Sequence, residues 1–295
     1  MLPCKCNFFE LFVIIMPETN PSVPPKENLP TMYDLPSEEP EDSAIRDGIE
    51  PPPSPRDTLP TMYDLPSEHP EDPGLPDTFH FFQAELLNNT FFPANYPQEE
   101  VFSAADLNLY YDVTHQNWYK RPDWFAAVGV SQLYDHRDLR LSYVVWQERL
   151  NPFIVVELLS PTTQKEDLGQ TSREPSQPPT KWEVYEQLLR IPYYVVFDRY
   201  EDRLRIFGLN CGHYQLLELS EPRLWLEEIG IGIGIWEGRY KEIERRWLRW
   251  YDAENNWIPT PEERADSEKQ RADSEKQRNE RLIAQLRSLG VEPDL

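Results

Sequence analysis

The stretch FIVVELLS, residues 153–160, decides how the rest of the chain is interpreted. Phe153 to Leu159 forms an apolar run of strand length, typical of a strand buried on both faces of a sheet. Glu157 interrupts this run. A buried carboxylate costs several kcal/mol unless it is paired, protonated or bound to a metal. The sequence therefore marks Glu157 as a candidate functional acid, and the alternative is a structural acid that faces solvent on an edge strand.

A second carboxylate, Asp123, stands after Pro122 and opens another apolar run, WFAAVGV. Two acids on neighbouring strands can hold one divalent metal, which activates water and offsets charge on a phosphate. Mg²⁺ accepts such a site because it binds through one or two carboxylates and keeps several waters, and Mn²⁺ is an alternative. The backbone carbonyl of Leu158 is a candidate third ligand. The competing interpretation of Asp123 is a residue that merely starts a strand.

Hydrophobic periodicity predicts a mixed α/β fold. A helix is expected over 79–89, and a second over 181–190, where Thr180 and Glu183 fit a capping box. The segment 104–113 is compatible with helix or strand, and IGIGIWEG at 231–238 with a strand or turn. Strands are expected over 123–130, 142–147, 153–159, 193–198, 203–207 and 213–219. This order predicts a mixed central sheet flanked by helices.

Other chemistries find little support in the sequence. The five histidines are scattered, which disfavours a zinc site, and no phosphate-binding loop or dinucleotide fingerprint is present. Asp198 is expected to be a turn or structural residue rather than a ligand. Five tryptophans are expected to fill the core or line a groove: Trp118, Trp124, Trp146, Trp182 and Trp236.

Composition divides the chain into three expected parts, 1–76, 77–260 and 261–295. Residues 1–100 hold 19 of the 30 prolines and a net charge of −15, so we expect residues 1–76 to be a disordered acidic segment. It carries LPTMYDLPSE twice, interpreted as a copied linker or a docking motif. Residues 261–295 repeat ADSEKQR and predict a charged helix, leaving open a weak coiled coil and a homo-oligomer.

Cellular location is addressed by the cysteines and by the first residues of the chain. The three cysteines show no disulfide or metal-ligand spacing, which favours a reduced, cytoplasmic setting. The apolar stretch Leu11 to Met16 is too short to span a bilayer, so no membrane association is expected. Either Met1 or Met16 is a candidate start.

Four motifs follow one another along the chain: RPDW at 121–124, VVELLSPTT at 155–163 with Asp167 following, KWEVY at 181–185 and IPYYVVFD at 191–198. As an ordered set, they resemble the Uma-two family of restriction endonucleases. That family resembles the PD-(D/E)XK nucleases, and the similarity covers roughly residues 77–260. The resemblance implies an αβββαβ core and a magnesium-dependent endonuclease that cuts DNA. It also implies that Asp123 and Glu157 are the metal-binding acids and that Lys181 is the active-site lysine.

The position of the lysine departs from the pattern of the nuclease superfamily. There the lysine stands two residues after the acid on the same strand, whereas here that position is Leu159. Lys181 must therefore reach the acids from a helix, and Lys165, expected on a mobile loop, is the rival. A rival function is an inactive nuclease fold that acts as a protein-interaction module. Metal binding would distinguish the two functions.

Overall fold

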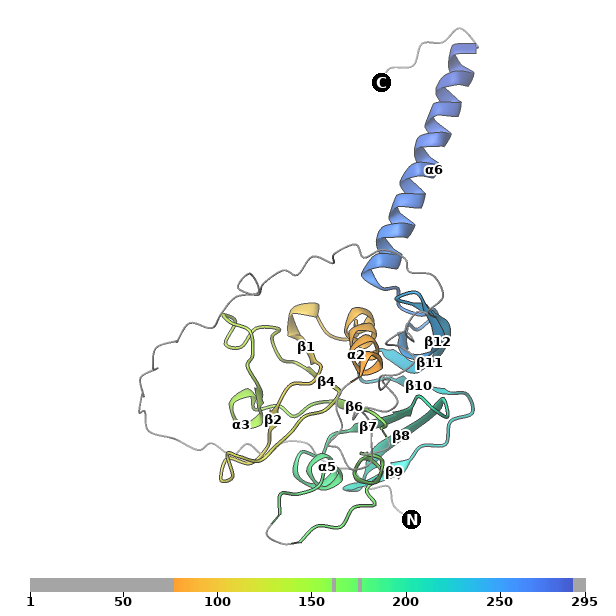
Figure 1. The fold of residues 1–295 in the computed structure, drawn as a ribbon. Helices are drawn as coiled ribbons and strands as arrows, with labels where there is room; N and C mark the ends of the chain where they lie inside the picture. Colours follow the sequence, from red (N-terminus) through yellow and green to blue (C-terminus); the bar gives the residue numbers. More distant parts are fainter. Residues whose placement is uncertain (1–76, 161–162, 175–176, 289–295) are drawn as a thin grey trace, which may run out of the picture. The chain divides into compact units, whose positions relative to one another are not determined.

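The computed structural model describes residues 77–160, 163–174 and 177–288 (Figure 1). All of them belong to the second of the two units into which the chain divides, Met62–Leu295. The predictions for the acidic front segment, its repeated TMYDLP motif and the two candidate starts lie outside the described residues.

A six-stranded mixed sheet forms the centre of the fold, in the order β1-β4-β6-β7-β8-β9. The strands are β1 (Val101–Ala104), β4 (Trp124–Val128), β6 (Ile154–Leu158), β7 (Tyr193–Asp198), β8 (Arg203–Asn210) and β9 (His213–Leu216). Strands β6 and β7 are parallel, and the other neighbouring pairs are antiparallel. All five residues of β6 are buried between β4 and β7. The alternative interpretation, in which Glu157 faces solvent on an edge strand, is therefore wrong.

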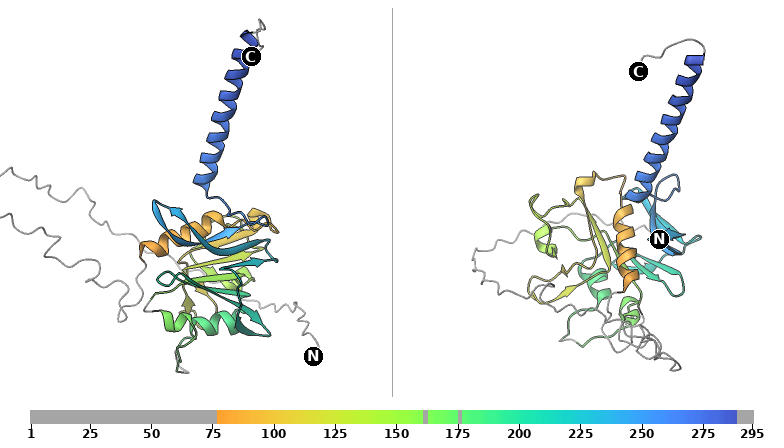
Figure 2. Two further views of the ribbon diagram at one scale, coloured as in Figure 1. Left: turned by 90° about the vertical axis from the view of Figure 1, so that its right-hand side faces the viewer. Right: turned by 45° about the horizontal axis from the view of Figure 1, so that its top comes forward.

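Different elements cover the two faces of this sheet. Because side chains alternate along a strand, Ile154, Val156 and Leu158 point to one face, and Val155, Glu157 and Leu159 to the other. The first face packs against α2 (Thr78–Thr90) and a three-stranded antiparallel sheet. The second packs against α5 (Lys181–Glu183) and its continuation η2 (Val184–Leu188). Figure 2 shows these layers, with α2 and α5 on opposite sides of the sheet.

The principal elements follow the predicted order αβββαβ: α2, β1, β4, β6, α5 with η2, and β7. A small sheet of β2 (Leu109–Tyr110), β3 (Tyr119–Lys120) and β5 (Tyr143–Val144) is inserted between these elements, and η1 (Gln98–Glu100) precedes β1. The mixed α/β fold with a central mixed sheet is confirmed. The segment 104–113, left open from sequence, is mainly extended or irregular and contains no helix.

The strand predicted over 142–147 is largely wrong. Only Tyr143 and Val144 form a strand, which pairs with β2 outside the central sheet. The chain then turns through α3 (Val145–Glu148), which ends at Arg149 with φ of 60°. This turn places Glu148 against the buried guanidinium of Arg140, with Nε to Oε1 at 2.7 Å. This ion pair, between residues eight apart in the sequence, accompanies a helical turn where local β propensity favours extension.

The second sheet, which the sequence did not predict as a layer, consists of β10 (Arg223–Leu226), β11 (Ile231–Tyr240) and β12 (Ile243–Tyr251). It contributes Trp247 and Trp250 to the core, both almost fully buried. Trp124 is also fully buried, as expected, but Trp146 on α3 is 37% exposed and does not fill the core.

The C-terminal segment forms α6 (Pro261–Ser288), which confirms the predicted helical tail. None of its residues is buried. No helix in the described part of the chain is long and apolar enough to cross a membrane. Lys165, expected on a loop, lies instead on the short helix α4 (Gln164–Asp167), where it is exposed.

Candidate functional site

The centre of the site is Glu157, which β6 carries into the layer beneath α5 and η2. Its side chain is fully buried. The Tyr185 hydroxyl donates to Oε1 over 2.9 Å, and the Lys181 ammonium donates to Oε2 over 3.0 Å. Burial raises the pKa of Glu157 well above its usual range, against the opposing attraction of Lys181. The carboxylate is therefore oriented by two donors in a place where its charge is costly.

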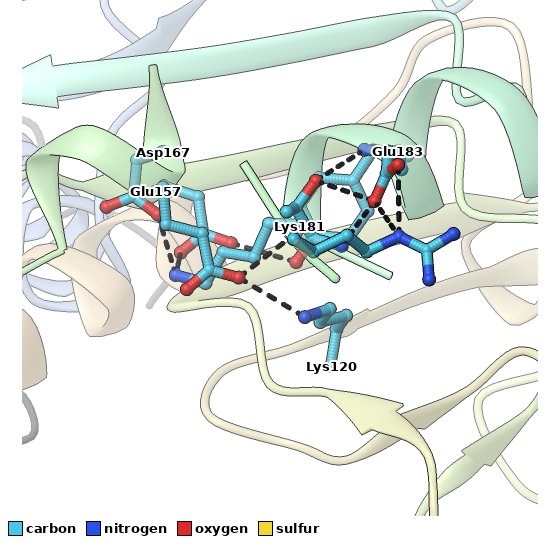
Figure 3. A network of polar contacts seen from close by, with 9 residues as sticks. Lys120, Glu157, Asp167, Lys181 and Glu183 are labelled. Atoms are coloured by element: carbon cyan, nitrogen blue, oxygen red, sulfur yellow. Dashed lines mark hydrogen bonds and ion pairs between the residues drawn. The ribbon is translucent and has the colours of Figure 1, made fainter. Parts of the chain in front are cut away.

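Lys181 bridges two acids at the start of α5, as Figure 3 shows. Its Nζ lies 3.0 Å from Glu157 Oε2 and 2.8 Å from Asp167 Oδ1, and the side chain is 15% exposed. Burial by itself would lower the pKa of Lys181, but the carboxylates of Glu157, Asp167 and Asp123 together hold it well above its usual value. The lysine is therefore charged and confined to one position.

The start of this helix is fixed by further polar contacts. Thr180 and Glu183 form the predicted capping box, with the Thr180 amide donating to Glu183 Oε2 over 2.8 Å. Glu166 Oε1 accepts the backbone N–H of Lys181 over 3.1 Å and the ammonium of Lys120 over 3.2 Å. A carboxylate is favourable at a helix N-terminus, and here it offsets the unfavourable position of Lys181.

Asp123 lies immediately before β4 and is partly exposed. Its Oδ2 accepts the Leu158 N–H over 2.6 Å, which ties this acid to the end of β6. Burial raises the pKa of Asp123, with Lys181 and His80 acting in the opposite direction. Asp123 also lines a cavity of about 480 Å³ together with other residues, among them Asp77, His80, Glu85, Asn88 and Asp106.

His80, in the first turn of α2, reaches the same end of β6. Its Nε2 lies 3.2 Å from the Leu158 carbonyl oxygen, and its Nδ1 lies 2.7 Å from Asp77 Oδ1. Asp77 also forms an ion pair with Arg199. Burial would lower the pKa of His80, but the hydrogen bond to Asp77 and the charges of Asp123 and Asp77 raise it.

The donor set fits a hard divalent cation. Three carboxylates, those of Asp123, Glu157 and Asp167, interact electrostatically with the single ammonium of Lys181. Asp167 Oδ2 is buried and accepts no hydrogen bond from the described residues. No group of three or more His, Cys, Asp or Glu side chains in the described ranges is placed so that it could hold a metal ion. Mg²⁺ does not need such a group, because one or two carboxylates, a carbonyl and waters are enough.

The structure brings the predicted residues to one end of β6, though not all into direct contact. Glu157 and Lys181 are hydrogen-bonded, and Asp123 meets the backbone of Leu158. No role in the site is predicted from the sequence for Asp167, Tyr185 or His80. Two of them had a usable signal, since Tyr185 follows Lys181 by one helical turn and His80 follows the helix cap Asp77 by three residues.

Comparison with known proteins gives one family. None of the curated proteins compared matches the chain in sequence. A crystal structure described as a "putative nuclease belonging to DUF820", from Anabaena variabilis, is 10% identical, with a TM-score of 0.37. The alignment covers 57% of this chain and 87% of that one. The model of the Uma2 family matches residues 58–237. Since that match spans more than half of the sequence, the chain belongs to the Uma2 family, whose description is "putative restriction endonuclease".

Proposed function

We propose that this protein is a magnesium-dependent endonuclease that hydrolyses phosphodiester bonds in DNA. The proposal rests chiefly on one observation: the largely buried ammonium of Lys181 is held against the carboxylates of Glu157 on β6 and Asp167 on α4. Membership of the Uma2 family supports the same reaction class. A buried ion pair is weak evidence for stability, because desolvating the charges offsets much of their attraction. Functional use gives a reason to keep these charges buried.

Asp123, Glu157 and the Leu158 carbonyl would hold the metal, with Mn²⁺ able to replace Mg²⁺. When bound, the ion would lower the pKa of a coordinated water and offset negative charge on the phosphate. The hydroxyl of Tyr185 donates to Oε1 of Glu157, and the ammonium of Lys181 donates to Oε2, so the orientation of the carboxylate is fixed. Because both acids are held by hydrogen bonds, they are oriented before the cation arrives.

Lys181 supplies the fixed positive charge of the site. Its ammonium would orient the attacking water or stabilise the phosphate, and it also donates to Asp167 Oδ1 over 2.8 Å. A charge held in one place contributes more to the transition state than a mobile one, because less reorganisation is needed during the reaction.

The substitution Glu157→Gln tests the proposal. The amide is nearly isosteric with the carboxylate, so the fold should survive while magnesium-dependent DNA cleavage falls by orders of magnitude. A suitable control is Glu186→Gln, since Glu186 is another buried acid, on η2, whose carboxylate accepts the Tyr214 N–H over 2.7 Å. This control should cleave normally. Full activity in a folded Glu157→Gln variant would contradict the proposal.

A second candidate function is an inactive nuclease fold that binds other proteins. It is favoured by the fact that Lys181 already neutralises part of the acid cluster without a metal. Calorimetric titration with Mg²⁺ or Mn²⁺ separates the two functions. A nuclease should bind the ion at a site abolished by Asp123→Ala, whereas an inactive interaction module need not bind it.

A further inference from the structure

A cavity of about 480 Å³ lies along one side of α2, where Asp123 of the proposed metal site also lines it. Its lining residues on this helix, from the cap Asp77 to Asn88, follow the spacing i, i+3, i+4, i+7, which places them on one face. This stretch spans about 16 Å, at roughly 1.5 Å per residue. Ligand pockets usually have volumes of roughly 300–1,000 Å³, so the space is large enough for a small planar group.

Phe81 supplies an exposed aromatic ring to this cavity. The helix buries Phe79, Leu86 and Leu87 in the core, whereas Phe81 is 67% exposed and lines the cavity. A single exposed apolar side chain needs no explanation by itself. Here, however, the exposed ring and an acid of the proposed metal site share one cavity. Aromatic side chains in nucleic-acid-binding proteins stack on the flat faces of bases, largely without regard to sequence.

Asn88 adds a hydrogen-bond donor whose orientation is fixed by its neighbours. The indole N–H of Trp124 can only donate, so the side-chain oxygen of Asn88 must face it, and the two atoms lie 2.7 Å apart. The same oxygen accepts the Ser103 hydroxyl over 2.9 Å. The amide nitrogen of Asn88 donates to no acceptor in the described ranges. A donor of this kind can bind the edge of a nucleobase.

The charges around the cavity favour a neutral group over a phosphate. Three of the four acids that line it in the described part of the chain form ion pairs with basic side chains. The pairs are Asp77 with Arg199, Glu85 with Lys241 and Asp106 with Arg121. These cations are therefore already engaged, and little positive charge is left for an anion. An uncharged ring avoids repulsion from the remaining acid, Asp123.

We propose that this cavity receives one unpaired nucleobase of the DNA strand that is cut, an inference that rests on the proposed function. The base stacks on Phe81 and accepts a hydrogen bond from Asn88. Because a base is joined to its phosphate through a single sugar, a base bound here keeps a phosphate beside Asp123. A base must leave the duplex stack to enter a pocket, which costs least where it is already unpaired. Single-stranded DNA is therefore the substrate of choice for the test.

Abasic substrates test the inference with the full chain. The position of the cut is first mapped on an end-labelled single strand with Mg²⁺ or Mn²⁺. The strand is then made with one abasic site at each nucleotide around the cut. One of these sites should lower kcat/KM of the wild type by roughly fivefold to a hundredfold, the range expected for the loss of a stacked base.

The variant Phe81→Ala should cut the intact strand more slowly by a similar factor and lose its sensitivity to the abasic site. Tyr134→Ala is the matched control, because Tyr134 is another exposed aromatic residue, 40% exposed, that does not line the cavity. It should cut as the wild type does and keep the sensitivity. Equal sensitivity in wild type and Phe81→Ala, or no sensitive position, would overturn the base site and leave the proposed function intact. Absence of metal-dependent cutting by the wild type would overturn both.

Discussion

At the scale of single residues, the placement of Lys181 separates it from its rival Lys165. Lys181 contacts Glu157 and Asp167 from a capped helix start, whereas Lys165 is exposed on α4. We predict that Lys181→Met lowers metal-dependent cleavage by orders of magnitude and that Lys165→Met costs at most a few-fold. The reason is that a positioned charge is worth far more to catalysis than a mobile one.

Both lysine variants should be assayed side by side at the same metal and salt concentrations. Circular dichroism of each variant checks that the fold is retained, since Lys181→Met leaves two buried carboxylates without their ammonium. The reverse ranking of the two activities would move the active-site lysine to α4.

Site residues could be predicted where they stand out against their neighbours in the sequence. Glu157 stood out because an acid inside an apolar strand is anomalous, and Asp123 because it opens the next apolar run. Asp167 and His80 were not assigned because their relevant partners are distant. Leu158 lies 78 residues from His80, and Lys181 lies 14 residues beyond Asp167. The spacing of Asp77 and His80 marks a helix start, but no local pattern reports these distant contacts.

At the scale of elements, Gly169 connects α4 to the helix that carries Lys181. It has φ of +67°, and a Cβ there would stand 2.7 Å from the ring of Trp182. That ring is held edge-on by Tyr194, Phe207 and Tyr214. We predict that Gly169→Ala destabilises the protein by about 2–4 kcal/mol, adding overpacking to left-handed strain, and lowers cleavage by displacing Lys181.

Gly212 is the matched control for this prediction. It has φ of +87°, but nothing lies within 4 Å of its added Cβ. Gly212→Ala should therefore cost only the strain, about 1–2 kcal/mol, and leave cleavage unchanged. Thermal denaturation and cleavage assays on both variants measure the difference. Equal effects of the two substitutions would show that contact with Trp182 is unimportant.

A second element-scale prediction concerns the junction between β12 and α6. Arg249 is almost fully buried and donates from Nη1 to Glu263 Oε1 over 3.1 Å. Burial opposes ionisation of Glu263, but hydrogen bonds from Arg249 and Thr260 lower its pKa below 4.5. A lowered pKa gives stability that is present above the unfolded value and is lost as the pH falls through the folded value.

We therefore expect Glu263→Gln to lower stability near neutral pH by about 1 kcal/mol, since Glu263 is partly exposed. The difference from wild type should shrink at acidic pH, as the native carboxylate also becomes protonated. Chemical denaturation of both proteins at the two pH values measures this. A gap that is independent of pH would mean that the charge of Glu263 contributes nothing.

Helices and strands could be predicted where local sequence preferences agree with the packing of the whole fold. The helix beginning at Lys181 was expected from Thr180 and Glu183, whose capping box is present. Its continuation η2, a π-helical turn, was not expected, because sequence periodicity does not distinguish it from ordinary helix. The sheet β10–β12 was missed as a layer because its alternating glycines predict a strand without saying where it packs. At Gly232, for example, the ring of Tyr251 fills the space that a Cβ atom would occupy.

At the scale of the whole molecule, we predict that deleting residues 1–75 leaves the melting temperature of the domain within about 2–4 °C of wild type, equivalent to less than about 1 kcal/mol. Their acidity and proline content argue that they bury little apolar surface. The family match begins at residue 58, so a variant that lacks only residues 1–57 should be compared with the variant that lacks residues 1–75. A large drop only for the longer deletion would extend the folded domain to the segment 58–75.

The delivery of Lys181 from a helix rather than from β6 has an evolutionary consequence. The strand position two residues after Glu157 is Leu159, which belongs to the packed core. Mutation can therefore remove the ammonium without altering any residue of the sheet. In this architecture the sheet can therefore be inherited without the lysine. Descendants that lose the lysine should keep Leu159 or another apolar residue at that strand position. Under the proposed function, their sequences would record the loss of activity at the helix start alone.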